Sequence, residues 1–420
     1  MTLLKTPYKG ARDYYPDDKA LQNYIFNKWR DVVESFGYRE YGIPLLEPLD
    51  LYLAKSGTEL ARDQAYSFED KGERSVTIRP EATPSVSRLV AGRRQDLVYP
   101  AKLYSIANFM RYERPQKGRE REFWQLNVDA FGADGVGADA ETILLAEKLL
   151  KSLGATAKDF TILVSHRGLL TEIFKNFIGL NEDQIKPLVK LIDNINKISA
   201  DDFSRGVGEI ITEATQSEKF NKIISVKSLD QLTELIGENK YLIELKSLFT
   251  LLIDLDVDTA RFDISLVRGL DYYTGIVFEV IDNSPENHRS IFGGGRYDGL
   301  VEMFGVESIG AIGFAPGYTT TELFLRTHNL LPKYLPSIDV YVATLDQEYF
   351  AGILAAEFLR GQGYKVDIDL TDRKLDKKIK SANKKSAKFL VVVGSDEAKS
   401  KKISLKDLNT GEQQNAISFK

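Results

Sequence analysis

The chain has 420 residues, carries a net charge of −5 and contains 43% hydrophobic and 28% charged residues. This balance is typical of a soluble globular protein with a sizeable core and excludes disordered and fibrous architectures. There is no cysteine, which excludes disulfide frameworks, zinc ribbons and thiol nucleophiles, and three histidines argue against a multi-histidine metal site. No apolar run approaches the ~18 residues of a membrane-spanning helix, and no secretory signal is visible. We therefore expect a cytoplasmic, multidomain protein with no bound metal and no membrane partner.

The first third of the chain is predicted to alternate helices with strands. Apolar residues recur at helical spacing from Leu21 to Phe36, and Gly37 is placed to end that helix. The segment that follows is expected to be extended, because Pro44 and Pro48 do not allow a helix to continue. Further strands are predicted near residue 78, up to residue 113 and over residues 122–132, and an amphipathic helix over residues 138–154.

The character of the sequence changes twice more. Residues 167–257 are rich in Leu, Ile, Lys and Glu and are predicted to form an all-helical insertion. Strand character returns over residues 262–281, and a proline-containing linker follows. The last 84 residues, 337–420, alternate strand and helix in a β-α-β-α-β pattern, which predicts a small α/β domain.

A basic run lies within this last domain. Residues 373–388 carry eight basic side chains and one acidic side chain. Such a run is most often a solvated helix face, but clustered lysine and arginine also supply the sequence-independent part of nucleic-acid affinity. Both interpretations remain open from the residues alone.

The most informative stretch runs from Arg111 to Asp129. Period-two alternation places Phe123, Gln125 and Asp129 on one face of a strand and apolar residues on the other, which predicts a polar pocket above a solid core. The connection before this strand is rich in cations, and arginine suits bidentate phosphate binding. A solvated hairpin tip would have a similar composition.

Three other segments carry polar groups of the same kind. In TIRPEAT, a strand ends at Glu81 and Thr83, which can accept hydrogen bonds from an ammonium group. In LVRGLDYYTG, Arg268 follows apolar residues and must be paired, because an unpaired buried charge is costly. A structural Arg–Asp pair would also satisfy it. The glycines of GGGRYDG, residues 293–299, let the backbone approach a ligand closely, although the spacing is neither Walker nor Rossmann.

Taken together, RPEAT, MRYERPQKGREREFWQLNVDAFG, VRGLDYYTG and GGGRYDG resemble the histidyl-tRNA synthetases, a family of class II aminoacyl-tRNA synthetases. The order and spacing of the segments match over nearly the whole chain. The resemblance implies an α+β fold: a class II catalytic domain on an antiparallel sheet with a helical insertion, and a C-terminal α/β anticodon-binding domain. The implied boundaries are residues 1–166 and 258–325 for the catalytic domain, 167–257 for the insertion, 326–336 for a linker and 337–420 for the anticodon-binding domain.

The resemblance also implies a function and a set of partners. The enzyme would be an ATP-dependent histidine–tRNA ligase that forms histidyl-adenylate and transfers histidine to the 3′ end of tRNA(His). Mg²⁺ would bridge phosphate oxygens of the ATP substrate. A homodimer is implied, with the first long helix and the Pro44 strand at its interface.

Residue roles follow from the same resemblance. Arg111 and Arg268 would be catalytic and bind the α-phosphate, with Glu113, Arg119 and Phe123 completing the ATP site. The implied histidine-binding residues are Glu81, Ala82, Thr83, Gln125, Asp129, Tyr272 and Tyr273. The implied tRNA-binding residues are Gln116, Arg373, Lys374, Lys377 and Lys378.

One motif departs from the family pattern. The third class II motif usually reads like GFAMGLERL, and its arginine binds the ATP tail. Here the segment reads GFAPGYTTTEL, so that Thr320 stands at the arginine position and Pro316 at the approach to the helix. We therefore expect an active ligase with reduced activity and weakened ATP affinity.

Two other functions are alternatives to a histidine ligase. A non-catalytic synthetase-like protein, such as the regulatory subunit of ATP phosphoribosyltransferase, would tolerate the loss of the arginine. That subunit generally lacks the anticodon-binding domain, which this chain retains. A ligase for another amino acid is disfavoured because RGLDYY is typical of histidine enzymes.

Overall fold

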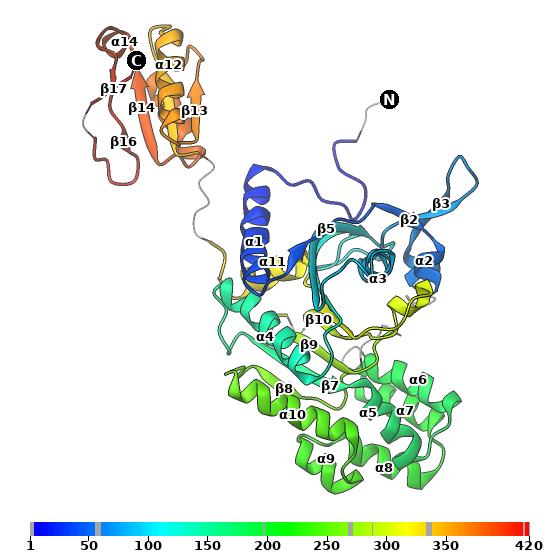
Figure 1. The fold of residues 1–420 in the computed structure, drawn as a ribbon. Coiled ribbons are helices and arrows are strands. Elements are labelled where there is room, and N and C mark those ends of the chain that lie inside the picture. The colour runs from blue at the N-terminus through cyan, green and yellow to red at the C-terminus, as the bar shows by residue number, and fades with distance from the viewer. Residues whose placement is uncertain are drawn as a thin grey trace. The chain divides into compact units, whose positions relative to one another are not determined.

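The computed structural model describes residues 4–54, 60–195, 198–267, 272–287, 289–332, 338–414 and 416–419. The chain divides into two compact units (Figure 1). Met1–Asp13 and Gln22–Leu331 form the first unit, and Tyr14–Leu21 and Pro332–Lys420 form the second. None of the helices in the described ranges is long and apolar enough to cross a membrane.

The first unit is built on an eight-stranded sheet in which every pairing between the six central strands is antiparallel. In spatial order the strands are β1 (Arg39–Glu40), β5 (Ala101–Met110), β6 (Glu122–Phe131), β11 (Ala311–Phe314), β10 (Ser290–Arg296), β9 (Ile276–Asp282), β7 (Phe160–His166) and β8 (Ala260–Phe262). The two edge strands, β1 and β8, pair in parallel. The antiparallel sheet confirms the predicted α+β architecture.

Helices cover both faces of this sheet. The helices are α1 (Pro16–Ser35), α3 (Thr83–Gly92), α4 (Val136–Ser152) and α11 (Tyr318–Thr327). On one face Phe26 of α1 packs against Trp124 of β6 and Tyr318 of α11, with ring centroids 5.6 and 5.9 Å apart. On the other face Val86 and Val90 of α3 belong to a buried cluster with residues of the sheet. The polar face of β6 is therefore the one that α3 covers.

A smaller sheet borders this core. Its strands, in spatial order, are β2 (Leu46–Pro48), β4 (Ser75–Ile78) and β3 (Tyr66–Glu69). Short helical segments complete the region: α2 (Asp50–Leu53), η1 (Leu60–Gln64) and η4 (Val301–Phe304). As the two prolines predict, the chain from 38 to 48 contains short strands and no helix.

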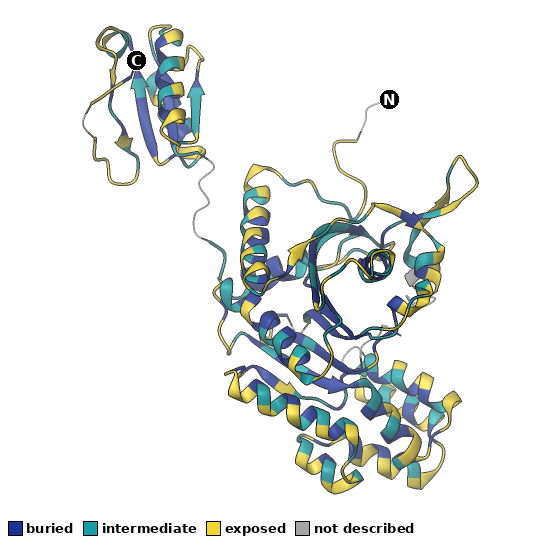
Figure 2. Ribbon diagram, viewed as in Figure 1, coloured by how far each residue is buried: buried dark blue, intermediate teal, exposed yellow. Residues whose placement is uncertain are grey.

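The insertion is helical, as predicted. Its elements are α5 (Arg167–Glu172), η2 (Ile173–Ile178), α6 (Glu182–Asp193), α7 (Ala200–Ile210), α8 (Ala214–Ile224), α9 (Leu229–Ile236) and α10 (Lys240–Asp254). Of the helices described in the insertion, five begin at a side-chain cap, which satisfies otherwise unpaired backbone N–H groups; the capping residues are His166, Asn181, Ser199, Ser228 and Asn239. Each helix buries one side and exposes the other (Figure 2).

The second unit contains a four-stranded sheet with helices on both faces. In spatial order its strands are β13 (Val366–Asp369), β12 (Val340–Thr344), β14 (Phe389–Val393) and β16 (Lys406–Asp407). The helices are α12 (Tyr349–Gly361), α13 (Leu375–Lys384) and α14 (Ser395–Ser400), and a two-stranded ladder joins β15 (Lys402–Ile403) to β17 (Ile417–Ser418). Because β12 pairs in parallel with β13 and β14, crossover helices are required, which explains the alternation seen in the sequence.

Candidate active site

A pocket opens in the first unit where β6 meets the start of α11. It is lined by Arg111, Glu113, Gly118, Arg119, Glu120, Phe123, Gln125, Ile291, Ala315, Gly317, Thr319 and Thr320. The structure thus brings together four of the five residues that the sequence assigned to ATP. The fifth, Arg268, lies outside the described residues.

The cationic and aromatic groups of this pocket hold one another in place. Arg111 donates from Nε to the carbonyl oxygen of Pro80 at 2.9 Å, and its guanidinium lies 5.3 Å from the ring centre of Phe123. Phe123 in turn packs against Phe109, with centroids 5.9 Å apart. Arg119 pairs with Glu113 at 3.0 Å. A flat ring, fixed arginines and a carboxylate suit a ligand with an aromatic base and phosphates.

Thr320 lies in the wall of the pocket, at the position where the family has its arginine. Its hydroxyl lies within hydrogen-bond distance of two carbonyl oxygens, 2.9 Å from that of Ile291 and 3.0 Å from that of Gly317, and can donate to either. The Pro316 carbonyl accepts from the Leu126 N–H at 3.0 Å, and α11 begins at Tyr318. The proline therefore precedes the helix and does not keep it away from β6.

Deeper in the same unit, Asp129 lies four residues beyond Gln125 on the polar face of β6. Its side chain is buried, with 3% of the residue exposed, and the Tyr297 hydroxyl donates to its Oδ1. Its Oδ2 has no hydrogen-bond partner among the described residues. Burial raises the pKa of Asp129 to about 7, and the hydroxyls of Tyr297 and Tyr41 oppose this increase. An orphaned buried acceptor of this kind suits a ligand N–H.

A line of tyrosines connects Asp129 with Glu81. The Tyr272 hydroxyl donates to Oε2 of Glu81 at 3.4 Å, and the Tyr272 ring lies 5.1 Å from that of Tyr273 and 5.9 Å from that of Tyr297. Glu81 is 4% exposed. Burial is the main cause that raises the pKa of Tyr272 well above its ordinary value, and the Glu81 charge adds to it. The two carboxylates therefore lie at opposite ends of one aromatic chain.

The other residues predicted for histidine lie around this chain. Ala82 is fully buried between Glu81 and the start of α3, and Thr83 is the first residue of that helix. Gln125 donates from Nε2 to the Ala315 carbonyl at 3.1 Å and also lines the outer pocket. Gln125 thus lies in the outer pocket, on the same face of β6 as the buried Asp129.

Glycines let the site side chains lie against the backbone. A Cβ at Gly313 would lie 2.7 Å from Oδ1 of Asp129, and a Cβ at Gly295 would lie 3.0 Å from the Tyr273 ring. The glycine-rich segment therefore makes room for protein side chains of the site. Sequence reasoning missed Tyr41 and Tyr297, although Tyr297 stands within GGGRYDG and a polar residue next to a glycine run was the available signal.

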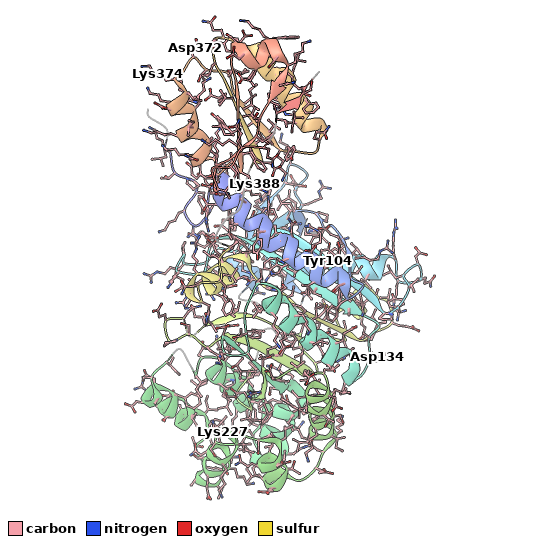
Figure 3. All side chains as sticks on the ribbon, turned by 90° about the vertical axis from the view of Figure 1, so that its left-hand side faces the viewer. Tyr104, Asp134, Lys227, Asp372, Lys374 and Lys388 are labelled. Carbon is pink, nitrogen blue, oxygen red and sulfur yellow. The ribbon has the colours of Figure 1, made fainter. Side chains whose placement is uncertain are left out.

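The residues predicted to contact tRNA lie in both units. Gln116 is exposed in the turn before β6, where its backbone exchanges hydrogen bonds with Arg119. In the second unit Lys374 and Lys377 are exposed at the start of α13, and Figure 3 labels Lys374 at the surface. Arg373 is partly exposed and pairs with Asp369 at 2.6 Å.

Lys378 differs from its neighbours because it is fully buried. Its ammonium donates to the carbonyl oxygens of Thr344 and Asp369, at 2.5 and 3.0 Å. It follows Lys377 by one residue, which turns it about 100° around the helix, toward the sheet. The basic run therefore has an outer and an inner side, and Lys378 is on the inner side.

Comparisons with known proteins agree with this geometry. A family model described as histidyl-tRNA synthetase matches residues 10–319, and one described as an anticodon binding domain matches residues 339–420. A histidine–tRNA ligase of Leptospira biflexa is 40% identical over 411 residues, which are 97% of this chain and 94% of that protein.

Solved structures give the same result. A histidyl-tRNA synthetase from Nostoc sp. has a TM-score of 0.83 at 25% identity and covers 99% of this chain and 97% of its own. A Bacillus halodurans protein, described as an ATP phosphoribosyltransferase regulatory subunit/histidyl-tRNA synthetase, has a TM-score of 0.77 at 22% identity and covers 94% of this chain and 100% of its own. The second likeness shows the fold alone.

Proposed function

Because the chain belongs to the histidyl-tRNA synthetase family, we propose that the pocket between β6 and α11 activates histidine with ATP. The function is that of a histidine–tRNA ligase, an ATP-dependent enzyme that joins histidine to tRNA. The observation that carries the residue assignment is that one face of β6 leads from an open pocket, which holds two arginines and an aromatic ring, to a buried cluster of carboxylates and tyrosines. We call these two regions the open and the buried compartment.

The buried compartment would bind histidine. Glu81, Thr83 and Gln125 would accept hydrogen bonds from its ammonium group, and the free Oδ2 of Asp129 would accept from an imidazole N–H. Tyr273 would lie beside the imidazole, and Tyr297 would hold Asp129 in place. A pocket with buried polar groups rejects analogues strongly, because a ligand without the matching groups leaves them unpaired.

The open compartment would bind ATP. Phe123 would stack on the adenine, and Arg111 would hold the α-phosphate against the histidine carboxylate. Two carboxylates, Glu113 and Glu120, line this pocket, which fits Mg²⁺ because that ion is bound by one or two carboxylates together with substrate phosphates. Bound there, the ion would neutralise phosphate charge. We assign Arg268 to the same site on the family resemblance.

The proposed reaction has two steps. A carboxylate oxygen of histidine attacks the α-phosphorus, and the bond from that phosphorus to the bridging oxygen breaks, which releases pyrophosphate. A ribose hydroxyl at the tRNA 3′ end then attacks the acyl carbon, loses its proton and displaces AMP. Arg111 stabilises the charge that develops on the α-phosphate, so that catalysis is mainly positioning and electrostatic stabilisation.

The tRNA would contact both units. We propose that Gln116 touches the acceptor end and that Lys374 and Lys377, with Arg373, contact the anticodon region. Because Lys378 is enclosed, we assign it to the stability of the domain instead. The proposed domain boundaries are those expected from the sequence, with the anticodon-binding domain over residues 337–420.

The protein would act as a homodimer in the cytoplasm, where tRNA and ATP are available. The exposed Leu45 and Leu46 beside Pro44, at 49 and 48% exposure, support an interface at this strand, because exposed neighbouring apolar side chains favour burial by a partner. Sedimentation of the protein at micromolar concentration tests the dimer. A single species of 47.3 kDa would contradict it.

Thr320 leads us to propose weakened ATP affinity in an active enzyme, because a threonine supplies no positive charge for the terminal phosphates. The regulatory-subunit alternative is less favoured, because the chain carries the anticodon-binding domain and a complete acidic pocket. Histidine-dependent exchange of pyrophosphate into ATP by the purified protein tests the function. Exchange that needs histidine supports it, and the absence of exchange at saturating ATP would support the alternative.

A further inference from the structure

Among the described residues, the lining of the open pocket has no excess of positive charge, which a nucleoside triphosphate would require. Its lining contains two arginines, Arg111 and Arg119, and two glutamates, Glu113 and Glu120. The formal charge of these described residues is therefore zero, and Thr320 adds none. Arg268, which we assign to the α-phosphate, would leave the terminal phosphates without a cation of their own. Because ATP is strongly anionic, a further cation close to α11 would strengthen its binding.

The N-terminal segment brings such a cation to α11. The Gly10 carbonyl accepts from the N–H groups of Arg121 and Glu122 at 2.7 and 3.2 Å, so that the segment pairs with the start of β6. Gly10 has a φ of +87°, and a Cβ there would lie 2.7 Å from the Arg121 side chain. The turn is thus specific to glycine, and it fixes the backbone two residues before Arg12.

The Arg12 guanidinium is bound by a carboxylate of α11, one helical turn from a residue that lines the pocket. Its Nη1 donates to Oε2 of Glu322 at 2.7 Å, and Glu322 follows the pocket residue Thr319 by three positions, on the same side of α11. The Thr319 hydroxyl donates to Glu120 at 2.8 Å. Burial raises the pKa of Glu120 and the Arg12 charge lowers it, which agrees with an Arg12 close to this carboxylate.

Glu322, the carboxylate that pairs with Arg12, also pairs with a second arginine. Arg326 donates from Nε and Nη2 to Oε1 of Glu322, at 3.0 and 2.6 Å. If Arg12 turns toward an anion in the pocket, Glu322 stays paired, so the movement leaves no buried charge without a partner. The Arg12 side chain is 28% exposed, and neither Arg12 nor Arg326 lines the pocket in this structure, so that Arg12 would have to turn to reach a bound anion.

We propose that Arg12 binds the terminal phosphates of ATP and supplies part of the positive charge that Thr320 does not. The inference rests on the proposed function, in which this pocket holds ATP. The planar guanidinium can give two parallel hydrogen bonds to a phosphate, and the hydrogen bonds to the Gly10 carbonyl hold the segment that carries Arg12 against the start of β6.

Arg12→Gln tests the proposal, because glutamine keeps much of the length and removes the charge. We expect the KM for ATP in pyrophosphate exchange, and the Kd for ATP by calorimetry, to rise about 10-fold or more, with the KM for histidine unchanged. Adding Thr320→Arg to this variant should restore ATP affinity. Unchanged ATP affinity in Arg12→Gln would overturn the proposal.

Two control variants separate phosphate binding from support of the helix. Arg326→Gln removes the other arginine on Glu322, and Glu322→Gln removes the ion pair but keeps Arg12. Both should leave the ATP affinity within about twofold of the parent. If Glu322→Gln weakens ATP as much as Arg12→Gln does, the role of Arg12 is structural and the proposal is wrong. If Arg12→Gln does not fold, Glu322→Gln compared with the parent still tests the proposal, because a loss of ATP affinity of about 10-fold in Glu322→Gln would show a structural role and contradict it.

The outcome is distinguishable from failure of the proposed function. If the parent shows no histidine-dependent exchange, the function fails, and calorimetry with ATP alone still tests Arg12. Weaker ATP binding by Arg12→Gln would then support the phosphate contact in a non-catalytic protein. Equal binding by parent and variant would overturn the inference whatever the activity.

Discussion

The two compartments of the proposed active site, one assigned to histidine and the other to ATP, differ in how their polar groups are held. In the histidine compartment Asp129 and Glu81 are 3 and 4% exposed and lie among buried tyrosines, with glycine backbone against Asp129. In the ATP compartment the Arg119 side chain is 57% exposed and pairs with a single carboxylate. Burial makes each polar group costly to replace, whereas exposed charges are screened and can substitute for one another. This difference agrees with the proposal that the open compartment tolerates threonine at position 320 in place of the family's arginine, whereas the buried compartment retains all its predicted polar residues.

The largest expected effect is on stability, in the buried compartment. Asp129→Asn should stabilise the ligand-free protein at pH 8 by at most about 4 kcal/mol and hardly at all at pH 4. The folded protein binds a proton at Asp129 up to a pKa of about 7, whereas the unfolded chain releases it near the ordinary value. Parent stability therefore falls as pH rises through this window, and asparagine does not titrate. Chemical denaturation of the parent and the variant at several pH values measures the difference between their free energies of unfolding.

Asp159→Asn is the control of opposite sign. Burial acts to raise the pKa of Asp159, but hydrogen bonds from Thr156 hold it below its ordinary value. Its charged form is therefore favoured in the folded state, and the substitution should destabilise the protein at pH 8. If Asp129→Asn changes the free energy of unfolding by the same amount at every pH, burial does not raise the pKa of Asp129 and the prediction is wrong.

The next effect is on histidine activation. Asp129→Asn should lower kcat/KM for histidine by about 1.5–3 kcal/mol, roughly 10- to 150-fold, because the imidazole N–H loses a charged acceptor. Glu120→Gln is the matched change in the open compartment. Because Glu120 is one of the two proposed Mg²⁺ ligands, this change should raise the KM for ATP but alter kcat/KM for histidine at saturating ATP less than about threefold. Pyrophosphate exchange with varied histidine measures both. Equal losses in the two variants would remove the contrast between the compartments.

A smaller effect is expected from exposed charge in the second unit. Replacing Lys374 and Lys377 together by glutamate should weaken tRNA binding about 10-fold and flatten its salt dependence, because phosphate contacts release counterions. Exchange without tRNA should not change. The same replacement at the exposed Lys399 and Lys401 is the control. Equal tRNA affinities of the two double variants would exclude a specific role for the start of α13.

The smallest effect is expected at the position that departs from the family. Thr320→Arg should lower the KM for ATP by about 3- to 10-fold, since the added charge faces the phosphates in a partly exposed pocket. Thr320→Gln controls for size and should bring no gain. If Thr320→Arg leaves the KM unchanged, the charge at the terminal phosphates is already sufficient in the parent chain.

Several features followed from the sequence because they depend on neighbours along the chain. The period-three-to-four spacing after Pro16 predicted α1, and the alternation over 122–132 predicted both the strand and the polar face that carries Gln125 and Asp129. The β-α-β alternation predicted the α/β organisation of the second unit, in which β12 pairs in parallel with β13 and β14. Local periodicity reports which side of an element is buried, so these predictions needed no knowledge of the fold.

Only the tertiary structure decided which distant groups meet. Tyr297 reaches Asp129 across 168 residues of sequence, and Arg12 reaches Glu322 across 310. Lys378 looks in the sequence like the lysines around it, but the packing of α13 on its sheet turns it inward. Hydrophobic burial decides which elements pack together, and the polar partners then depend on the register between them, which no local pattern records.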